Sequence, residues 1–335
     1  MQRFFHLLGM GKYLPRQSVS SEEIDERLGL SPGTSFEKSG VKTRYYAGLE
    51  TVSAMGARAC QLALDEAGLT FADLDALIYV GASKEQGLPC NAVFIQRELG
   101  GEASGVPCFD IDATCLSFLV GLDQMTLSLM GGRFKRVLLV SSEVASKHLN
   151  TKHIESAALF GDGALAWLLA AEGDSLAKGE PSLICGSHME SYSEYIDVCG
   201  IKGGMSRLPA FAYKADRHED FCFHMDGRRL FKATLQLAPR AMERFLTKAS
   251  IPLEEISWVV PHQASASALE LLRRRLNIPE EKWVCIIETH GNQVSASIPT
   301  GFYELQRSGK LKKGQLVLLC GTGAGLGIGF TLMRY

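Results

Sequence analysis

Apolar residues recur along the chain with two spacings, which predict helices and strands in alternation. Helical spacing covers 51–67, 232–249 and 264–276. Short continuous apolar runs, typical of buried strands, cover 76–82, 135–143, 258–261 and 315–320, and the segment FFHLLGMGKYLP predicts a first strand and turn. Strands that alternate with helices predict an α/β fold with mixed, mostly parallel sheets.

The order of these elements recurs in the second half of the chain. AGLTFADLDALIYVGAS (67–83) and ASIPLEEISWVVPHQAS (249–265) both show a helix end, a turn, an acidic helical turn and a buried strand. GGRFKRVLLVSS (131–142) matches SGKLKKGQLVLLC (308–320) in the same way. Identity is low, so chance similarity is the alternative to a duplication. We expect two similar halves, 1–172 and 173–335, with the polar, turn-rich segment 173–222 providing the link and a loop over the site.

Composition narrows the class of protein. The net charge of −2 predicts no general attraction to nucleic acid or to an anionic membrane. No apolar run approaches the length of a membrane span, and the apolar N-terminus is interrupted by His6 and Gly9, unlike a signal peptide. Nine scattered cysteines without a CxxC pair favour reduced thiols and a cytoplasmic location over disulfides or a zinc site.

One cysteine lies where chemistry is plausible. In DIDATCLSFLVGLDQM, Cys115 stands between the strand-like run VPCFDID and an apolar helix. At the first turn of a helix, the dipole and free N–H groups stabilise a thiolate and lower its pKa. The alternative is a small buried residue in a strand-to-helix turn, and position alone leaves both open.

Two further polar residues follow buried segments in the second half. His262, in VVPHQAS, comes directly after a predicted strand, where it would be a site residue or simply a satisfied histidine. Asn292, in ETHGNQVSASIP, can donate a hydrogen bond without titrating, although HGN also has the composition of a turn. Because ligands bind at the carboxyl ends of strands in α/β sheets, Cys115, His262 and Gly321 are expected to converge.

The tail LLCGTGAGLGIGF resembles a dinucleotide-binding fingerprint only superficially. Six residues follow Gly329, which leaves no room for the helix, strand and ribose-binding acid that such a site requires. The glycines therefore favour close approach of a backbone N–H to a ligand, or tight packing between sheets.

Taken together, ATC at the start of a buried helix, PHQA, HGN and the glycine-rich tail resemble the thiolase superfamily. Within it, the chain is similar to ketoacyl-ACP synthase III over nearly its whole length, from GMGKYLP through SGVKTRYYA, FGDGA and HMDGRRLFK to LVLLCGTGAGLGIG. The resemblance implies a duplicated five-layered α-β-α-β-α fold, with the cysteine in one half and the histidine and asparagine in the other. It also implies a homodimer. The chalcone-synthase branch shares the three polar residues but has longer chains and a different tail loop.

The resemblance assigns roles to specific residues. Cys115 would be the nucleophile that takes an acyl group from a thioester, with the N–H groups of Cys115 and Ala324 holding the oxyanion. Neutral His262 and Asn292 would donate hydrogen bonds to a malonyl thioester as it loses CO2. A neutral donor implies a low pKa for His262. No metal, nucleotide or redox cofactor is needed, and the substrates would be acyl and malonyl thioesters of acyl carrier protein or CoA.

Departures from the family pattern refine this expectation. Five positions at which the family has an aromatic, basic or amide residue differ here, and they are Thr34, Lys38, Ile154, Ser265 and Ser267. Without those residues, the shelf that the family uses for a CoA adenine would be absent. The identities at these five positions argue against a CoA primer held in the usual manner, whereas Arg274 and Arg275 match a basic pair that docks the carrier protein; solvated helix charges are the alternative.

The position where some relatives place a glutamate base is occupied by Leu88, which favours decarboxylative condensation over condensation of two intact donors. Two other functions remain open: acyl transfer to an oxygen or nitrogen by the same site, and a non-catalytic role as a synthase partner. No pattern in the sequence predicts the primer length, the carrier or the pathway.

Overall fold

A nine-stranded mixed sheet is the framework of the protein, in the computed structural model that describes residues 2–335. In spatial order its strands are β11 (Trp258–Pro261), β12 (Leu316–Gly323), β13 (Gly327–Arg334), β8 (Ser182–Ser191), β1 (Arg3–Tyr13), β7 (Gly163–Ala171), β6 (Arg136–Glu143), β4 (Ala76–Val80) and β5 (Cys108–Ile111). Two small sheets pair β2 (Gln17–Ser20) with β3 (Thr43–Tyr46), and β9 (Cys199–Gly200) with β10 (His224–Met225).

Ten α-helices occur among residues 2–335. They are α1 (Ser21–Leu28), α2 (Thr34–Ser39), α3 (Val52–Ala67), α4 (Asn91–Glu98), α5 (Ser117–Met130), α6 (Ile154–Ala157), α7 (Gly227–Ala249), α8 (Ala266–Arg275), α9 (Ile287–His290) and α10 (Ser297–Arg307). Of these helices, none is both long enough and apolar enough to cross a membrane.

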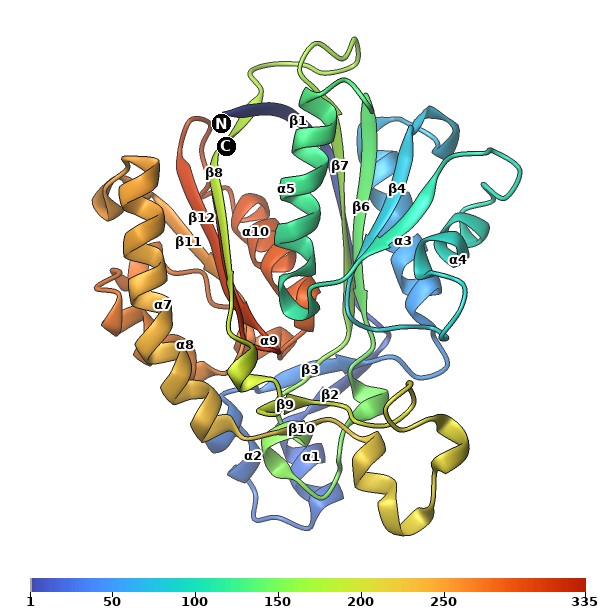
Figure 1. Ribbon diagram of the computed structural model, residues 1–335, viewed down its shortest axis with the longest axis vertical. Coiled ribbons are helices and arrows are strands. Elements are labelled where there is room, and N and C mark those ends of the chain that lie inside the picture. The colour runs from blue at the N-terminus through green and yellow to red at the C-terminus, as the bar shows by residue number, and fades with distance from the viewer. Residues whose placement is uncertain (1) are drawn as a thin grey trace.

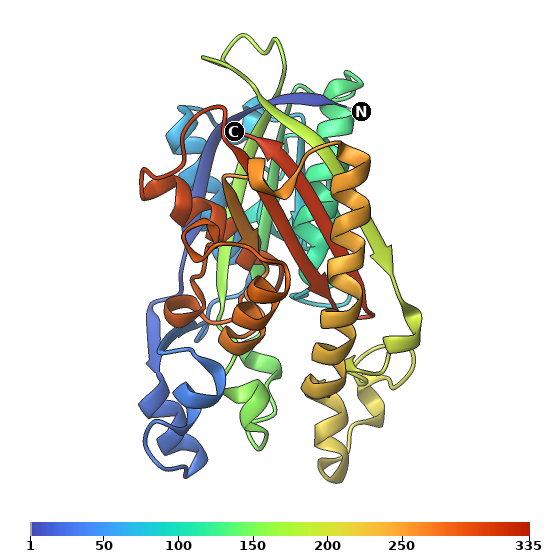
Figure 2. The same cartoon turned by 90° about the vertical axis from the view of Figure 1, so that its left-hand side faces the viewer.

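The elements form five layers, visible from right to left in Figure 1. Helices α3 and α4 cover one outer face, and α7 and α8 cover the other, with α7 lying along the C-terminal strands (Figure 2). Between the two parts of the sheet lie α5 and α10, whose side chains share one core with strands of both parts. Because α5 is mostly apolar, most of its surface can be buried in this middle layer, although Leu127 and Met130 in its C-terminal part stay exposed.

The strand order repeats. On one side the order β5-β4-β6-β7-β1 leads inward from the edge, and on the other β11-β12-β13-β8 does the same. A parallel bridge between Val259 and Trp283 stands where the fifth strand would pair. The linkers also match, since α3 and α7 both end at a left-handed residue, Gly68 and Ser250, followed by a 3₁₀ turn and a strand. We propose residue 172, between β7 and β8, as the division between the halves.

The predicted α/β architecture and its principal elements are confirmed, with three differences. The large sheet is mixed as expected but not mostly parallel, because five of its eight strand pairs are antiparallel: the parallel pairs are confined to β5-β4-β6 and β11-β12, whereas β7, β1, β8 and β13 pair antiparallel to one another and to their neighbours. Helix α7 begins at Gly227 rather than at 232, because the Asp226 carboxylate accepts the N–H of Arg229 and caps an additional turn. Strand β8 lies inside the segment predicted to be a turn-rich link. Its sequence, SLICGSHMES, has one β-branched residue, Ile184, and no Phe, Tyr or Trp, so it is poor in the residues typical of strands, but pairing with β1 and β13 on both sides stabilises it.

Candidate functional site

Cys115 lies in a short 3₁₀ turn, Thr114–Leu116, that joins the end of β5 to α5. Thr114 has a positive φ of 53°, which is unusual for a β-branched residue. The turn is held by Ser117, whose hydroxyl accepts the N–H of Ala113 at 2.9 Å and donates to the Thr114 carbonyl at 2.7 Å. The sequence-predicted position at a helix start is therefore present, with the thiol one turn ahead of α5.

Two opposing effects act on the thiol. Burial raises the pKa of Cys115 well above its ordinary value, and the nearby buried carboxylate of Glu143 raises it further. Hydrogen bonds from the backbone N–H groups of Cys115 and Ala324 lower the pKa, but by less. The lowering expected from the helix start is thus outweighed by desolvation. The same two N–H groups are those predicted for an oxyanion hole, and the structure brings both to the sulfur.

The glycine-rich tail forms the antiparallel pair β12–β13, packed against the turn that carries the thiol. A Cβ at Gly323 would lie 2.6 Å from Thr114 Oγ1, and a Cβ at Gly321 would lie 2.7 Å from His262 Cβ. Any larger residue would displace these groups. The glycines therefore serve close packing, as expected, and this packing brings the cysteine turn and His262 to the same strand.

His262 directly follows β11, where its N–H donates to the Cys320 carbonyl at 2.7 Å. The residue is 5% exposed, and its Nδ1 lies 2.6 Å from the hydroxyl of Ser297. Burial lowers the pKa of His262 to about 4, and the nearby Val294 carbonyl offsets this only in part. The imidazole is therefore neutral at physiological pH, as the resemblance implied.

Asn292 is fixed through its backbone and its side chain. Its N–H donates to the Leu159 carbonyl and its own carbonyl accepts the N–H of Gly161, so HGN pairs with the start of FGDGA. Gly291, at a φ of 67°, allows this approach, because a Cβ there would lie 2.9 Å from the Leu159 carbonyl oxygen. The carboxamide Oδ1 accepts the N–H of Val294 at 2.9 Å, which directs the donor Nδ2 the other way. That Nδ2 makes only a long 3.4 Å contact, to the Ala264 carbonyl.

These residues meet around Val294. The Val294 N–H donates to Asn292 Oδ1, and the Val294 carbonyl lies beside the His262 ring. The short helical turn that Val294 begins, Val294–Ala296, packs against the turn Thr114–Leu116. Like Thr114, Val294 is β-branched and has a positive φ, 49°. Backbone strain of this kind is found at functional sites. The structure thus brings Cys115, His262, Asn292 and Ala324 into one neighbourhood.

Two contributors were not predicted from the sequence. Glu143, at the end of β6, is fully buried and accepts the N–H groups of Ala82 at 2.8 Å and Ser83 at 2.9 Å, together with the hydroxyl of Ser295. Ser297 bonds to His262, as described above. An acid at the end of a strand whose centre, VLLV, is apolar was a visible signal for Glu143, whereas the serines of QVSAS carry no distinguishing pattern.

The positions that depart from the family pattern lie in α2, in α6 and at the start of α8. The end of α2 and the start of α8 are in close contact, since a Cβ at Gly40 would lie 2.1 Å from the Cβ of Ala266. Ile154 packs in an apolar cluster with Ile24 and Ala158, and its side chain provides no positive charge at this position. The hydroxyl of Ser265 accepts the N–H of Ala268 and caps α8, which is a structural use of that side chain.

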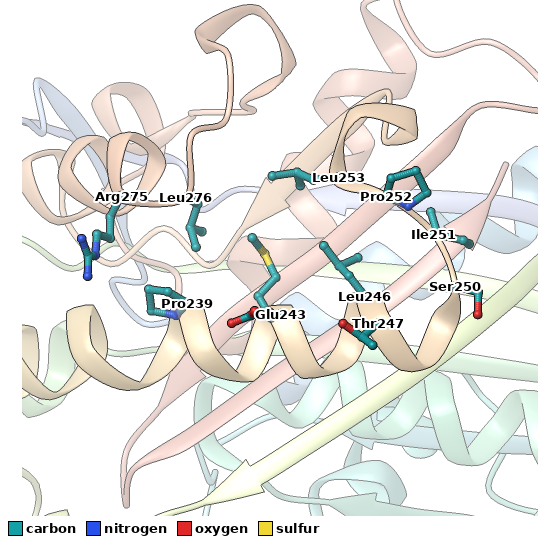
Figure 3. Close-up of a pocket in the computed structure, with 11 residues that line it drawn as sticks. Pro239, Glu243, Leu246, Thr247, Ser250, Ile251, Pro252, Leu253, Arg275 and Leu276 are labelled. Atoms are coloured by element: carbon teal, nitrogen blue, oxygen red, sulfur yellow. The ribbon is translucent and has the colours of Figure 1, made fainter.

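Arg274 and Arg275 lie at the far end of α8. Arg274 is paired with Glu270, although 71% of its side chain remains exposed. Arg275 borders a hollow of about 480 Å³ between α7 and the end of α8, lined by apolar residues such as Met242 and Leu246 (Figure 3). None of the four converging residues lines this hollow.

The buried, neutral state of His262 makes a spectroscopic prediction. Because burial holds its pKa near 4, its Cε1 proton resonance should not shift between about pH 5.5 and about pH 8, where an ordinary histidine titrates. NMR titration of the native protein, with the resonance assigned by its loss in His262→Asn, measures this. Titration close to an ordinary histidine pKa would contradict the buried geometry.

Comparisons with known proteins give the family. Residues 109–193 match the family model of 3-oxoacyl-[acyl-carrier-protein] synthase III, and residues 246–335 match the model of its C-terminal part. A beta-ketoacyl-[acyl-carrier-protein] synthase III from Erythrobacter litoralis is 33% identical over 98% of both chains, and one from Aquifex aeolicus is 32% identical over 98% of this chain and 99% of its own.

Solved structures agree. The crystal structure of the Aquifex aeolicus synthase III superposes with a TM-score of 0.86 at 29% identity, covering 100% of both chains. The priming beta-ketosynthase of the R1128 polyketide pathway gives 0.87 at 26% identity, covering 99% of this chain and 97% of its own. The protein has the thiolase-like fold and belongs to the 3-oxoacyl-[acyl-carrier-protein] synthase III family of condensing enzymes, which are acyltransferases.

Proposed function

We propose that this condensing enzyme loads an acyl group onto Cys115 and condenses it with a malonyl thioester, with loss of CO2, to a 3-oxoacyl product. The observation that carries the proposal is the shared contact of His262 and Asn292 with Val294, on the turn packed against the turn of Cys115. Two neutral hydrogen-bond donors beside a nucleophile held by two N–H groups suit both half-reactions.

In the first half-reaction, the sulfur of Cys115 attacks the carbonyl carbon of the acyl thioester. Negative charge develops on that oxygen, where the N–H groups of Cys115 and Ala324 stabilise it. The C–S bond to the donor then breaks, and the proton lost by the Cys115 thiol ends on the departing thiol. The exchange needs no net base, which is compatible with a thiol that burial keeps protonated.

In the second half-reaction, the malonyl C–C bond breaks and its electron pair moves toward the thioester carbonyl. His262 and Asn292 donate hydrogen bonds to that oxygen as its charge grows. Both groups are about 5% exposed, so water competes little for the developing enolate. The carbanion carbon then attacks the acyl carbonyl on Cys115, the 3-oxoacyl product forms, and the departing Cys115 thiolate takes up one proton from solvent to restore the thiol.

The chemistry around Leu88 favours the decarboxylative route. Leu88 itself is 85% exposed and cannot act as a base. Glu85, the nearest acid in sequence, accepts the N–H and the hydroxyl of Ser53 at the start of α3, so its carboxylate is engaged in capping a helix. A donor that loses CO2 requires no base at this position.

We also propose that the acyl group arrives on a carrier protein rather than on CoA. Ile154 is packed among apolar side chains, and Thr34 bonds locally to the Ser31 carbonyl at 2.6 Å, which leaves neither an arginine nor an indole for an adenine ring. A homodimer in the cytoplasm, with malonyl-carrier protein as the second substrate, completes the proposal. The names of the relatives place the beta-ketoacyl product on an acyl carrier protein, which supports malonyl-carrier protein as the second substrate.

The loading and condensation steps can be measured on one sample. Incubation with acyl-carrier protein should add one acyl mass to Cys115, and subsequent malonyl-carrier protein should release CO2 in equal amount. Cys115→Ser should abolish the adduct, and Asn292→Ala should keep it while CO2 release falls about 100-fold, the usual cost of one lost oxyanion donor. Intact mass spectrometry and labelled-CO2 capture are the readouts.

Other results would redirect the assignment. An adduct without CO2 from any malonyl thioester indicates acyl transfer to an oxygen or nitrogen acceptor. No adduct from any carrier or CoA donor indicates a non-catalytic partner. Faster loading from acyl-CoA than from acyl-carrier protein would overturn the carrier preference alone.

We propose that Arg274 and Arg275 dock the acidic carrier. Arg275→Glu should raise the KM for malonyl-carrier protein about tenfold with little change in kcat, because the change is remote from the thiol. Arg274→Glu should act more weakly, since Glu270 already neutralises that guanidinium. Malonyl-pantetheine, which has no protein surface, is the control substrate: a parallel loss with it would place the effect in the active site instead.

A further inference from the structure

The hydroxyl of Ser297, at the start of α10, lies between two groups of the site. Its Oγ is 2.6 Å from His262 Nδ1 and 2.8 Å from the Val294 carbonyl oxygen, and it accepts the N–H of Gln263 at 3.3 Å. A serine hydroxyl has a single hydrogen, so it donates either to the imidazole or to the carbonyl.

The choice between the two acceptors follows from what else each can bond. The Val294 carbonyl already accepts the backbone N–H of Ser297. For His262 Nδ1, the Ser297 hydroxyl is the hydrogen-bond partner, and Ser297 is fully buried, so solvent does not replace it. A buried nitrogen lone pair left without a donor costs more than a carbonyl that loses the second of two donors. The Ser297 hydroxyl therefore donates its hydrogen to His262 Nδ1.

The direction of this hydrogen bond determines what His262 can do. A neutral imidazole carries one N–H. When Ser297 donates to Nδ1, the hydrogen of the ring is on Nε2, which can then donate to a carbonyl oxygen that gains negative charge. In the opposite tautomer, Nδ1 donates to Ser297 and Nε2 presents a lone pair, which would repel that oxygen.

We infer that Ser297 is a positioning residue that holds His262 in the Nε2–H tautomer needed for decarboxylation. The inference rests on the function proposed above and extends it to a residue that touches no substrate. Asn292 is arranged by the same principle, because the Val294 N–H occupies its Oδ1 and leaves Nδ2 as the outward donor. One turn, from Val294 to Ser297, thus sets the donor polarity of both side chains.

Ser297→Ala tests this directly. Without the hydroxyl, the nearest remaining acceptor for the ring is the Val294 carbonyl, which favours a hydrogen on Nδ1. Decarboxylation of malonyl-carrier protein by the acylated enzyme should fall about 100-fold, with KM nearly unchanged, because a transition-state donor is lost. Acylation of Cys115, which needs no hydrogen on Nε2, should change less than about fivefold on the same reasoning.

Two further measurements separate positioning from a structural effect. Imidazole ¹⁵N shifts should report the Nε2–H tautomer for His262 in the native protein and the Nδ1–H tautomer in Ser297→Ala. Ser297→Thr, which keeps a hydroxyl, should recover decarboxylation. The matched control is Thr126→Val, which removes a fully buried hydroxyl that donates to the Leu122 carbonyl within α5, away from the site, and it should leave the ratio of the two half-reactions unchanged.

The inference is overturned if Ser297→Ala lowers acylation and decarboxylation by the same factor, or if the Nε2–H tautomer persists in that variant. Failure of the underlying function looks different: His262→Ala would then retain decarboxylation, whatever Ser297→Ala does. Loss of decarboxylation in His262→Ala but not in Ser297→Ala refutes the role of the serine alone.

Discussion

The site depends on the contact between two strained turns that open the two helices of the middle layer. Thr114 precedes Cys115 ahead of α5, and Val294 precedes Ser295 ahead of α10; both are β-branched and both have a positive φ. Strain of this kind persists only where surrounding contacts over-determine the conformation. Here the contacts include the backbone N–H groups of Ser117 and Ser297, each of which donates to the carbonyl three residues earlier in its turn. The two turns thus supply both sides of one site.

Burial gives these groups their chemical character. It keeps His262 neutral, raises the pKa of the Cys115 thiol, and removes water that would compete for a developing oxyanion. In such a place, fixed donors are effective because they need no reorganisation when charge appears. The N–H groups at the sulfur, the Asn292 amide and the His262 ring are all neutral donors, which suits a reaction in which negative charge appears first on one oxygen and then on another.

Much of this could be predicted from the sequence because it depends on local pattern. Buried strands such as β11 and β12 could be read from apolar runs, and the turns after β5 and β11 located Cys115 and His262. Strand β8 was missed because its pairing with β1 and β13, rather than its own side chains, makes it a strand. The lowered cysteine pKa was wrong because a helix-start argument contains no measure of burial, which here dominates.

The same limit applies to Glu143 and Ser297. Their roles depend on contacts between segments more than 30 residues apart, such as the bond from Ser297 to His262, and no spacing in the chain records them. Family resemblance placed the three polar residues, but the polarity of each hydrogen bond follows only from counting donors and acceptors around Val294.

The central claim is that one oxygen of the malonyl thioester receives hydrogen bonds from both His262 and Asn292. A crystal structure of the enzyme with a non-hydrolysable malonyl-thioester analogue measures this most directly. The account predicts a single carbonyl oxygen at about 3 Å from both His262 Nε2 and Asn292 Nδ2, with its malonyl carbon directed at the Cys115 sulfur. An analogue bound with that oxygen beyond hydrogen-bonding distance of either nitrogen would contradict it.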